Sequence, residues 1–412
     1  MKKITLITLI IFSTSIIFCQ QWEEVSPIPL EFSTLHHPVG FSFGQKGYVA
    51  TGADNSSAFG TKLFYEYNSI TDTWTQKEDF PGVERAYAIG DFYDGKGYLG
   101  FGFHQDSTGN LAYLNDLWSF DPVSDEWTQL SSCPCTPRIH PTFVTLNGKI
   151  YMGLGEEFQE LNDWWEYDIS SDVWTQKTDF PSTERHHPYQ FAMDNYVYTG
   201  FGHTEGVAIY NDWYRYDPAL DEWEQMASLP AQGRVAGTQF SYNGKGYVLS
   251  GQGENHNMIP EGEFWQYDPD LNEWSAMPSH PSSSRFAPGS FIIDGYAYLI
   301  HGIYSGYQNM DGVLRFKLPE ETNATESIHS NNLISISPNP FQEEIMLELK
   351  NIVVENNFVI KIYSANLQVI FEKKQMEQTL NLSFLPAGTF VVEIKNGGKK
   401  YTQQIIKVTN SK

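Results

Sequence analysis

A tryptophan recurs along this chain at steps of 47 to 53 residues. Each copy stands in a similar string, such as "SDEWTQL" or "SDVWTQK", and a Pro-bearing loop then leads to strings such as "NGKIYMGLG". Self-similarity at this period predicts an array of equivalent units, each of which buries its core against its neighbours. The recurring residues are Trp22, Trp74, Trp127, Trp174, Trp223 and Trp274.

Each unit is predicted to be a four-stranded antiparallel sheet. Asp-Gly and Asn-Gly pairs between apolar runs indicate tight hairpin turns, because both residues accept a positive φ. Alternating aromatic residues such as Trp164, Tyr167 and Trp174 suit half-buried strands. An Asp-Pro pair, as at Asp121-Pro122, opens the following turn. Sheets of about fifty residues match the repeat length of propeller blades.

Residues 21–318 resemble a kelch-repeat β-propeller. Gly-x-Gly pairs, such as Gly100 with Gly102, stand where that family usually has adjacent glycines. The resemblance predicts an all-β fold with a six-bladed ring. Trp22 comes too early to have a blade of its own, so its strand is expected to complete the sheet of residues 285–317. Closing the ring in this way protects edges that an open array would expose.

The two ends of the chain differ from the repeat region. Residues 1–20 combine a basic start with an apolar run and are predicted to be a secretory signal peptide. Residues 319–332 are polar and are interpreted as a linker. Residues 333–412 alternate in period two and predict a small β-sandwich.

The strings "SPNPF", "IYSANLQVI", "LPAGTFVVEI" and "QQIIKV" in this tail resemble the type A C-terminal sorting domain of type IX secretion. The resemblance implies a Gram-negative host, contact with the secretion machinery, passage across the outer membrane, and release or attachment at the cell surface. An ordinary accessory β-sandwich is the alternative.

Charge and cysteine content exclude several classes of protein. The net charge is −24, nearly all of it in residues 21–318, and such a surface repels nucleic acid and anionic membranes. After the signal peptide no stretch is long and apolar enough to span a bilayer. Cys133 and Cys135 are too few for a disulfide framework. They form either a loop with two thiols or one strained bridge, and a metal pair is the less favoured alternative. For the protein as a whole, neither a metal nor a cofactor is expected.

Arginine occupies one phase of the repeat. Five of the seven arginines stand eleven residues after a repeat tryptophan, and in the first repeat Leu35 holds the position. In the kelch family this position opens the innermost strand, near one mouth of the central channel. One interpretation is a structural bond to carbonyls of the neighbouring blade; the other is a cationic ring for an anion. The residues are Arg85, Arg138, Arg185, Arg234 and Arg285.

Histidine occupies a neighbouring position in only three repeats. Two residues after the arginine position stand His37, His140 and His187, whereas the other repeats have tyrosine or alanine. His203 belongs to a loop expected on the same face. A partly buried imidazole beside a proline is one interpretation; ligand contact, a proton shuttle or a metal is the other. The nine named arginines and histidines are the candidate ligand-binding residues at the funnel mouth.

Two functions remain open at this point. The favoured one is a secreted or cell-surface binding module for glycan or protein, in which aromatic side chains such as Tyr87, Phe103, Tyr189 and Tyr304 stack on sugar rings. The alternative is a sugar-acid epimerase or mutarotase, because the N-acetylneuraminate epimerases are exported six-bladed kelch proteins. That reaction needs an acid, a base and an arginine for the carboxylate. A copper oxidase like galactose oxidase is the least favoured alternative, because its chemistry needs a tyrosine crosslinked to a cysteine and the cysteines after the signal peptide lie only in "CPC".

Overall fold

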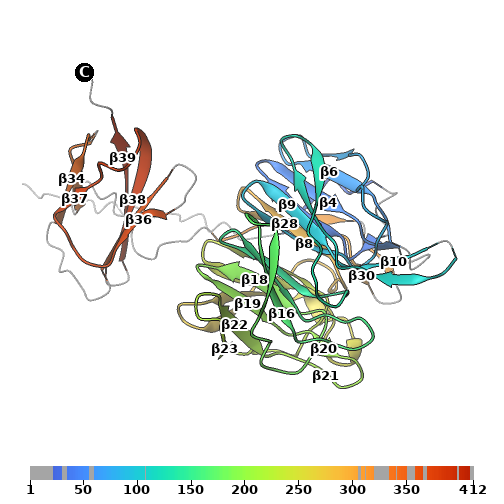
Figure 1. The fold of residues 1–412 in the computed structure, drawn as a ribbon. Helices are drawn as coiled ribbons and strands as arrows, with labels where there is room; N and C mark the ends of the chain where they lie inside the picture. The colour runs from blue at the N-terminus through green and yellow to red at the C-terminus, as the bar shows by residue number, and fades with distance from the viewer. Residues whose placement is uncertain are drawn as a thin grey trace, which may run out of the picture. The chain divides into compact units, whose positions relative to one another are not determined.

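The computed structural model describes residues 22–29, 35–54, 60–106, 108–304, 308–310, 312–319, 334–339, 341–349, 358–364, 369–396 and 399–408. The predicted signal peptide and most of the predicted linker lie outside these ranges. The chain forms two compact units, residues 1–318 and 319–412, which are considered separately below (Figure 1). No helix among the described residues is long and apolar enough to cross a membrane.

Six four-stranded antiparallel sheets account for most of the described residues of the N-terminal unit. The first three sheets in chain order follow, each from its first to its last strand. They are β3 (Val39–Phe43), β4 (Lys46–Ala50), β6 (Phe64–Asn68) and β7 (Thr73–Gln76); β8 (Ile89–Tyr93), β9 (Lys96–Gly100), β12 (Leu117–Asp121) and β13 (Glu126–Leu130); and β14 (Thr142–Leu146), β15 (Lys149–Gly153), β16 (Trp164–Asp168) and β17 (Val173–Lys177).

The other three sheets repeat this order, and the last one takes its fourth strand from the start of the chain. They are β18 (Tyr189–Met193), β19 (Tyr196–Gly200), β22 (Trp213–Asp217) and β23 (Glu222–Met226); β24 (Thr238–Tyr242), β25 (Lys245–Leu249), β26 (Phe264–Asp268) and β27 (Glu273–Met277); and β28 (Gly289–Ile293), β29 (Tyr296–Ile300), β32 (Val313–Lys317) and β1 (Trp22–Val25).

Longer loops join the second and third strands of each sheet. They carry three two-stranded ribbons, one strand of a fourth whose partner β2 precedes the first sheet, and two short 3₁₀ helices. These loops lie at the end of the unit where the first strands begin. This end is called the loop face below. The elements are β2 (Leu35–His36) with β5 (Ala53–Asp54), β10 (Phe103–Gln105) with β11 (Leu111–Tyr113), β20 (His203–Thr204) with β21 (Ala208–Ile209), β30 (Ile303–Tyr304) with β31 (Gln308–Asn309), η1 (Glu254–His256) and η2 (Pro260–Gly262).

The first strands of the six sheets lie next to one another in a cyclic order. Strand β3 contacts β8, the contacts continue through β14, β18, β24 and β28, and β28 contacts β3 again. The predicted hairpin turns lie at the opposite end from the long loops, here called the turn face. At Asn147-Gly148, for example, both residues have positive φ, of 50° and 79°.

Repeated hydrogen bonds explain why tryptophan marks the period. The indole N–H of Trp174 donates to the Ser131 carbonyl of the preceding sheet at 2.8 Å. The indole N–H of Trp22 donates to the Pro278 carbonyl at 3.0 Å, so β1 ties the last sheet to the one before it. Five of the six repeat indoles therefore link the outer edge of one sheet to its neighbour, whereas Nε1 of Trp127 has no hydrogen-bond partner among the described residues. Trp74, Trp223 and Trp274 make the equivalent bond.

The C-terminal unit consists of two antiparallel sheets that share one apolar core, which includes Ile345, Ile360, Leu382 and Ile405. One sheet contains β33 (Ile334–Ser337), β34 (Glu344–Leu349) and β37 (Thr379–Asn381). The other contains β36 (Val369–Lys373), β35 (Val359–Tyr363), β38 (Gly388–Asn396) and β39 (Lys399–Lys407).

In the N-terminal unit, Cys133 and Cys135 form a disulfide bridge, one of the two states that the sequence left open.

Candidate functional site

The five repeat arginines lie inside the sheets. Each is at most 2% exposed. Arg85 donates two hydrogen bonds of 2.7 Å to the carboxylate of Asp116, and a third of 3.2 Å to the Phe101 carbonyl. Such forked, charge-assisted bonds use most of the donors of a guanidinium group. The same pairing joins Arg138 to Asp163 and Arg185 to Asp212. Arg234 makes a single hydrogen bond of 2.8 Å to Glu263, and its Nε and Nη1 have no partner among the described residues.

The acidic partner immediately precedes the third strand of the same sheet, and two repeats depart from the pattern. Arg285 donates instead to the Gly312 carbonyl at 2.7 Å and to the His301 carbonyl at 3.1 Å. In the first repeat both members are leucines, Leu35 and Leu63, which share one apolar cluster.

This geometry favours the structural interpretation of the repeat arginines over ligand contact at the funnel mouth. Their side chains are buried and each bonds within its own sheet, so they support the scaffold. The partners are mainly carboxylates of the same sheet, rather than the carbonyls of the next one that the repeat pattern suggested. The residues concerned are Arg85, Arg138, Arg185, Arg234 and Arg285.

The histidine position has an unusual backbone in all six sheets. The residue there has a φ of 50° to 57°, in the left-handed region that residues other than glycine rarely adopt. Backbone hydrogen bonds link these positions to each other: His37 N–H donates to the Ala287 carbonyl at 2.9 Å, and His187 N–H to the His140 carbonyl at 3.2 Å. The position is therefore held at the axis. It contains His37, Tyr87, His140, His187, Ala236 and Ala287.

Three of the predicted histidines meet at this axis. Nε2 of His37 lies 3.1 Å from Nε2 of His187, and the rings of His140 and His187 stack with their centroids 3.4 Å apart. His203 lies one layer further out, where its backbone pairs with that of His186. The preceding Gly202 (φ 75°) permits this approach, because a Cβ at that position would lie 2.6 Å from the His186 carbonyl oxygen. The rings of His186 and His203 are 4.0 Å apart.

These imidazoles are neutral at physiological pH. Burial first, and the neighbouring histidines second, hold the pKa values of His37, His140 and His187 well below the usual 6.5. The same causes lower the pKa of His186 to about 3 and that of His203 to about 4. A neutral imidazole keeps a lone pair available for a ligand.

One carboxylate approaches this cluster. Glu156 Oε1 lies 3.5 Å from His186 Nε2 and 3.9 Å from His140 Nδ1. Burial, and then the charges of Glu160 and Glu205, raise the pKa of Glu156 to about 7. The loop face thus combines several neutral bases with a carboxyl group that titrates near neutrality.

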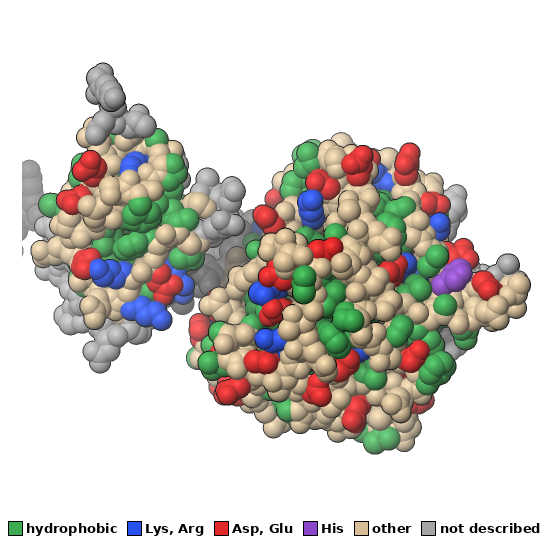
Figure 2. All heavy atoms as spheres, in the orientation of Figure 1, with side chains coloured by type: hydrophobic (Ala, Val, Ile, Leu, Met, Phe, Trp, Pro, Cys, Tyr) green, Lys and Arg blue, Asp and Glu red, His purple; other side chains and the backbone are tan. Residues whose placement is uncertain are grey.

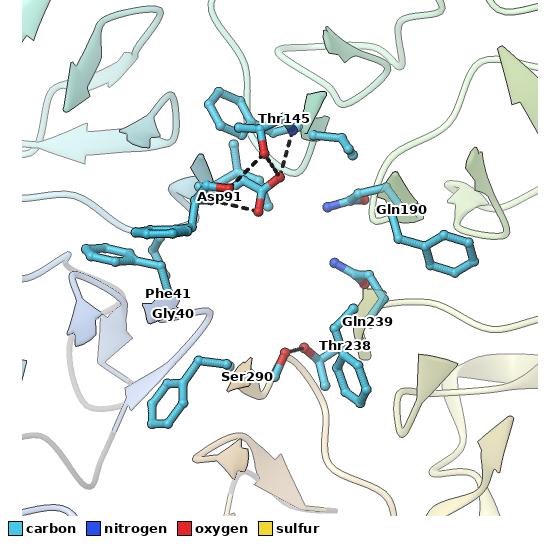
Figure 3. A pocket seen from close by; sticks show the side chains of 18 of the residues that line it. Gly40, Phe41, Asp91, Thr145, Gln190, Thr238, Gln239 and Ser290 are labelled. Carbon is cyan, nitrogen blue, oxygen red and sulfur yellow. Dashed lines mark hydrogen bonds between the residues drawn. The ribbon is translucent and has the colours of Figure 1, made fainter. Parts of the chain in front are cut away.

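A cavity that the sequence did not predict lies along the axis on the turn-face side. Its volume is about 540 Å³ and the first strands line it (Figure 3). Gln190, Gln239 and Ser290 occupy the same position in three strands, three residues after the histidine position. A search of that position for polar residues would have found them.

Asp91 lies at the wall of this cavity, where the equivalent residue of the other first strands is phenylalanine or valine. It accepts hydrogen bonds from Thr145 N–H at 2.7 Å and Thr145 Oγ1 at 2.8 Å, which join β8 to β14 (Figure 3). Burial raises its pKa. The contacts with Thr145 identify Asp91 chiefly as a link between neighbouring sheets.

Comparisons with known proteins agree with both units. Residues 335–408 match the model of the secretion system C-terminal sorting domain. The solved structure of YjhT superimposes with a TM-score of 0.59 at 15% identity, over 72% of this chain and 97% of the other.

Curated relatives match over shorter stretches. An N-acetylneuraminate epimerase of Pasteurella multocida (strain Pm70) is 28% identical over 114 residues, which is 27% of this chain and 29% of that protein. Kelch repeat and BTB domain-containing protein 1 of Cowpox virus (strain GRI-90 / Grishak) is 33% identical over 84 residues, 20% of this chain and 14% of that protein. The chain spans less than a third of the length of these relatives.

The N-terminal unit is therefore a kelch-type β-propeller, and the chain ends in a type IX sorting domain, which indicates secretion.

Proposed function

We propose that this chain is a secreted, cell-surface binding module whose propeller holds a glycan through aromatic rings on its loop face. The six four-stranded sheets act as six blades, and β1 closes the ring by pairing with β32 in the last of them. The long loops between second and third strands then surround one mouth of the axis, while the tight hairpins surround the other.

The observation that carries this proposal is a continuous row of aromatic rings from the axis to the rim. The ring of His140 lies 4.6 Å from that of Tyr87, and Tyr87 lies 5.2 Å from Phe103. Phe103 is followed by Tyr113 at 6.4 Å and by Phe158 at 5.5 Å.

Phe158 is 86% exposed at the rim end of this row. A row of rings that begins at the axis and emerges into solvent suits a chain of sugar rings, whose apolar faces stack on aromatic side chains. The predicted stacking residue Tyr189 does not contribute, because it is fully buried and donates to the Ser250 carbonyl.

Glycan-array binding of the secreted protein tests the proposal. Phe158→Ala and Tyr87→Ala are expected to weaken binding at least tenfold, since each removes a stacking surface. Ile70→Ala, which truncates an exposed apolar side chain on the turn face, is the matched control and should bind as the wild type does. The proposal fails if no glycan binds, or if all three variants bind equally well.

A sugar-acid epimerase is the second candidate, because several of the relatives are N-acetylneuraminate epimerases. An arginine to hold the substrate carboxylate is hard to find. Five of the seven arginines are buried in the sheets. The other two, Arg215 and Arg315, lie on third strands and pair with Glu224 and Glu23 of the adjacent fourth strands. Following the anomers of N-acetylneuraminate by NMR decides the matter: an equilibration rate equal to the spontaneous one excludes this activity.

A further inference from the structure

The axial histidines also bring together the donor atoms of a metal centre, although the stacked rings of His140 and His187 must turn for both to face one ion. His37, His140 and His187 each offer one ring nitrogen, and these three atoms lie within 4.8 Å of one another. We propose that they bind one divalent transition-metal ion of the zinc class. The sequence left a metal open as a less favoured interpretation of these histidines, and this inference does not depend on glycan binding.

The separation of two of the nitrogens fits a shared ion. Zinc binds histidine at about 2.0–2.1 Å with tetrahedral angles, which puts neighbouring ligand nitrogens about 3.3 Å apart. The Nε2 atoms of His37 and His187 are 3.1 Å apart. A hydrogen bond between the two rings would give a similar distance, so the distance alone does not decide between these arrangements.

Unpaired ring nitrogens favour the metal. Among the described residues, neither nitrogen of His140 has a hydrogen-bond partner, and neither does Nδ1 of His187, although these atoms are buried. Buried polar atoms without partners are uncommon in folded proteins and call for an explanation. Coordination to an ion would use one of the two unpaired nitrogens of His140, and imidazole is a favoured ligand of zinc, copper and nickel.

The backbone positions the three ligands before any ion arrives. All three histidines have left-handed φ values, of 54°, 51° and 52°, and each is followed by a proline. His37 is further oriented by a contact of 2.5 Å between its Nδ1 and Nδ1 of His36. Contacts of this kind fix the tautomer of a metal-binding histidine and leave the other nitrogen for the ion.

The site is open on one side. His37, His140 and His187 all line the axial cavity of about 540 Å³. Three protein ligands leave a fourth position of a tetrahedral ion for water or another small ligand, as in catalytic zinc sites, whereas structural sites use four protein ligands.

Metal binding by the full-length chain tests the inference. After treatment with a chelator, titration with Zn²⁺ should show one ion per chain, with a dissociation constant in the micromolar range or below. Co²⁺ in its place should give the intense visible bands of tetrahedral coordination. His187→Gln and His37→Gln should each weaken Zn²⁺ binding at least a hundredfold. His104→Gln, an equally conservative change outside the cluster, should leave the affinity within about threefold.

The possible results are distinct from those of the glycan array. Absence of stoichiometric Zn²⁺ binding overturns the inference, as does binding that survives both His187→Gln and His37→Gln. Loss on His256→Gln with His187→Gln unaffected also overturns it, because the ion would then sit in the outer group of His203, Glu205 and His256. If the axial variants fail to fold, the Co²⁺ spectrum of the wild type decides: weak octahedral bands count against the site.

Discussion

Four of the five repeat arginines form a structural unit with a carboxylate, and the exceptional first repeat explains why the two residues belong together. An arginine buried without its partner would be an uncompensated charge in a medium of low dielectric constant. Where Arg is replaced by Leu35, the acidic position is also apolar, at Leu63. The buried Leu35 and the partly buried Leu63 need no polar partner, so both positions change together.

Removing one carboxylate should therefore be costly. Asp163→Ala leaves Arg138 buried and unpaired, and we expect a loss of about 3–5 kcal/mol in the free energy of unfolding. The double variant Arg138→Leu with Asp163→Leu, which copies the first repeat, should lose less than the single one. Urea denaturation followed by tryptophan fluorescence measures both.

A surface pair provides the control for this prediction. Glu224 pairs with Arg215 but is 60% exposed in its side chain. Glu224→Ala should cost at most about 1 kcal/mol. Equal losses for Asp163→Ala and Glu224→Ala would contradict the structural role assigned to the buried pairs.

At the scale of the strands and turns, much of the fold could be predicted from the sequence. The tryptophan period, the Asn-Gly and Asp-Gly turns and the aromatic alternation are local signals, and each corresponds to an observed element. The histidine position was found for the same reason, because Arg and His-Pro strings recur at a constant offset from the tryptophan.

Contacts between residues far apart in the sequence could not be predicted in the same way. Nothing local to Asp163 indicates that it will meet Arg138, twenty-five residues earlier. The left-handed backbone at His37, His140 and His187 depends on hydrogen bonds between different sheets. The axial cavity likewise arises only when first strands that are far apart in the sequence come together around one axis.

In the proposed six-bladed ring, closure of the propeller depends on strand β1. Trp22 is 8% exposed, packs against Phe264 and Phe316, and belongs to a strand that pairs with β32. Trp22→Ala should lower the free energy of unfolding by about 3–5 kcal/mol. It should also promote aggregation, because an unpaired β32 edge can recruit another chain.

Thermal denaturation and light scattering together measure these two effects. Glu23→Gln is the control in the same strand, since the side chain of Glu23 is 53% exposed and pairs only with Arg315 at the surface. A Trp22→Ala protein as stable and as monomeric as Glu23→Gln would show that the ring does not need this strand.

At the scale of the whole molecule, buried neutral histidines make the propeller sensitive to acid. Burial first, and the nearby charge of Arg285 as well, lower the pKa of His301 to about 3, and burial lowers that of His280 to about 4. In the unfolded chain both titrate near 6.5. The unfolded state therefore gains protons first as the pH falls, and folding stability decreases between about pH 6.5 and 4.

The expected loss is up to about 3 kcal/mol for each such histidine over this range. Urea midpoints measured between pH 7.5 and 4, with a chelator present, would show it. His301→Leu should flatten this pH dependence, because it removes one of the buried titrating groups. The variant should still fold, since Leu154, at the equivalent position of the third repeat, adopts a φ of 60°. An unchanged pH dependence in that variant would contradict the assignment.

The two units of the chain have separate cores, and we expect them to fold independently and to serve different roles. The propeller has its own apolar clusters, and the C-terminal unit has a separate core of its own. Acidic side chains are spread over the visible face of the propeller in Figure 2, which suits a domain that stays soluble once exported. Deleting residues 333–412 should therefore leave the propeller folded but remove the surface on which the secretion machinery acts.

The truncated protein should accumulate in the periplasm of its host, whereas the full chain should reach the cell surface. Its tryptophan emission spectrum should match that of the full chain. Digestion of intact cells with an added protease distinguishes the two, since only exported propeller is cleaved. Fusion of residues 333–412 to an unrelated folded protein is the reciprocal control and should bring that protein to the surface. Export of the truncated chain at the normal level would mean that the delivery signal lies in the propeller, and the two units would then not be separable in function.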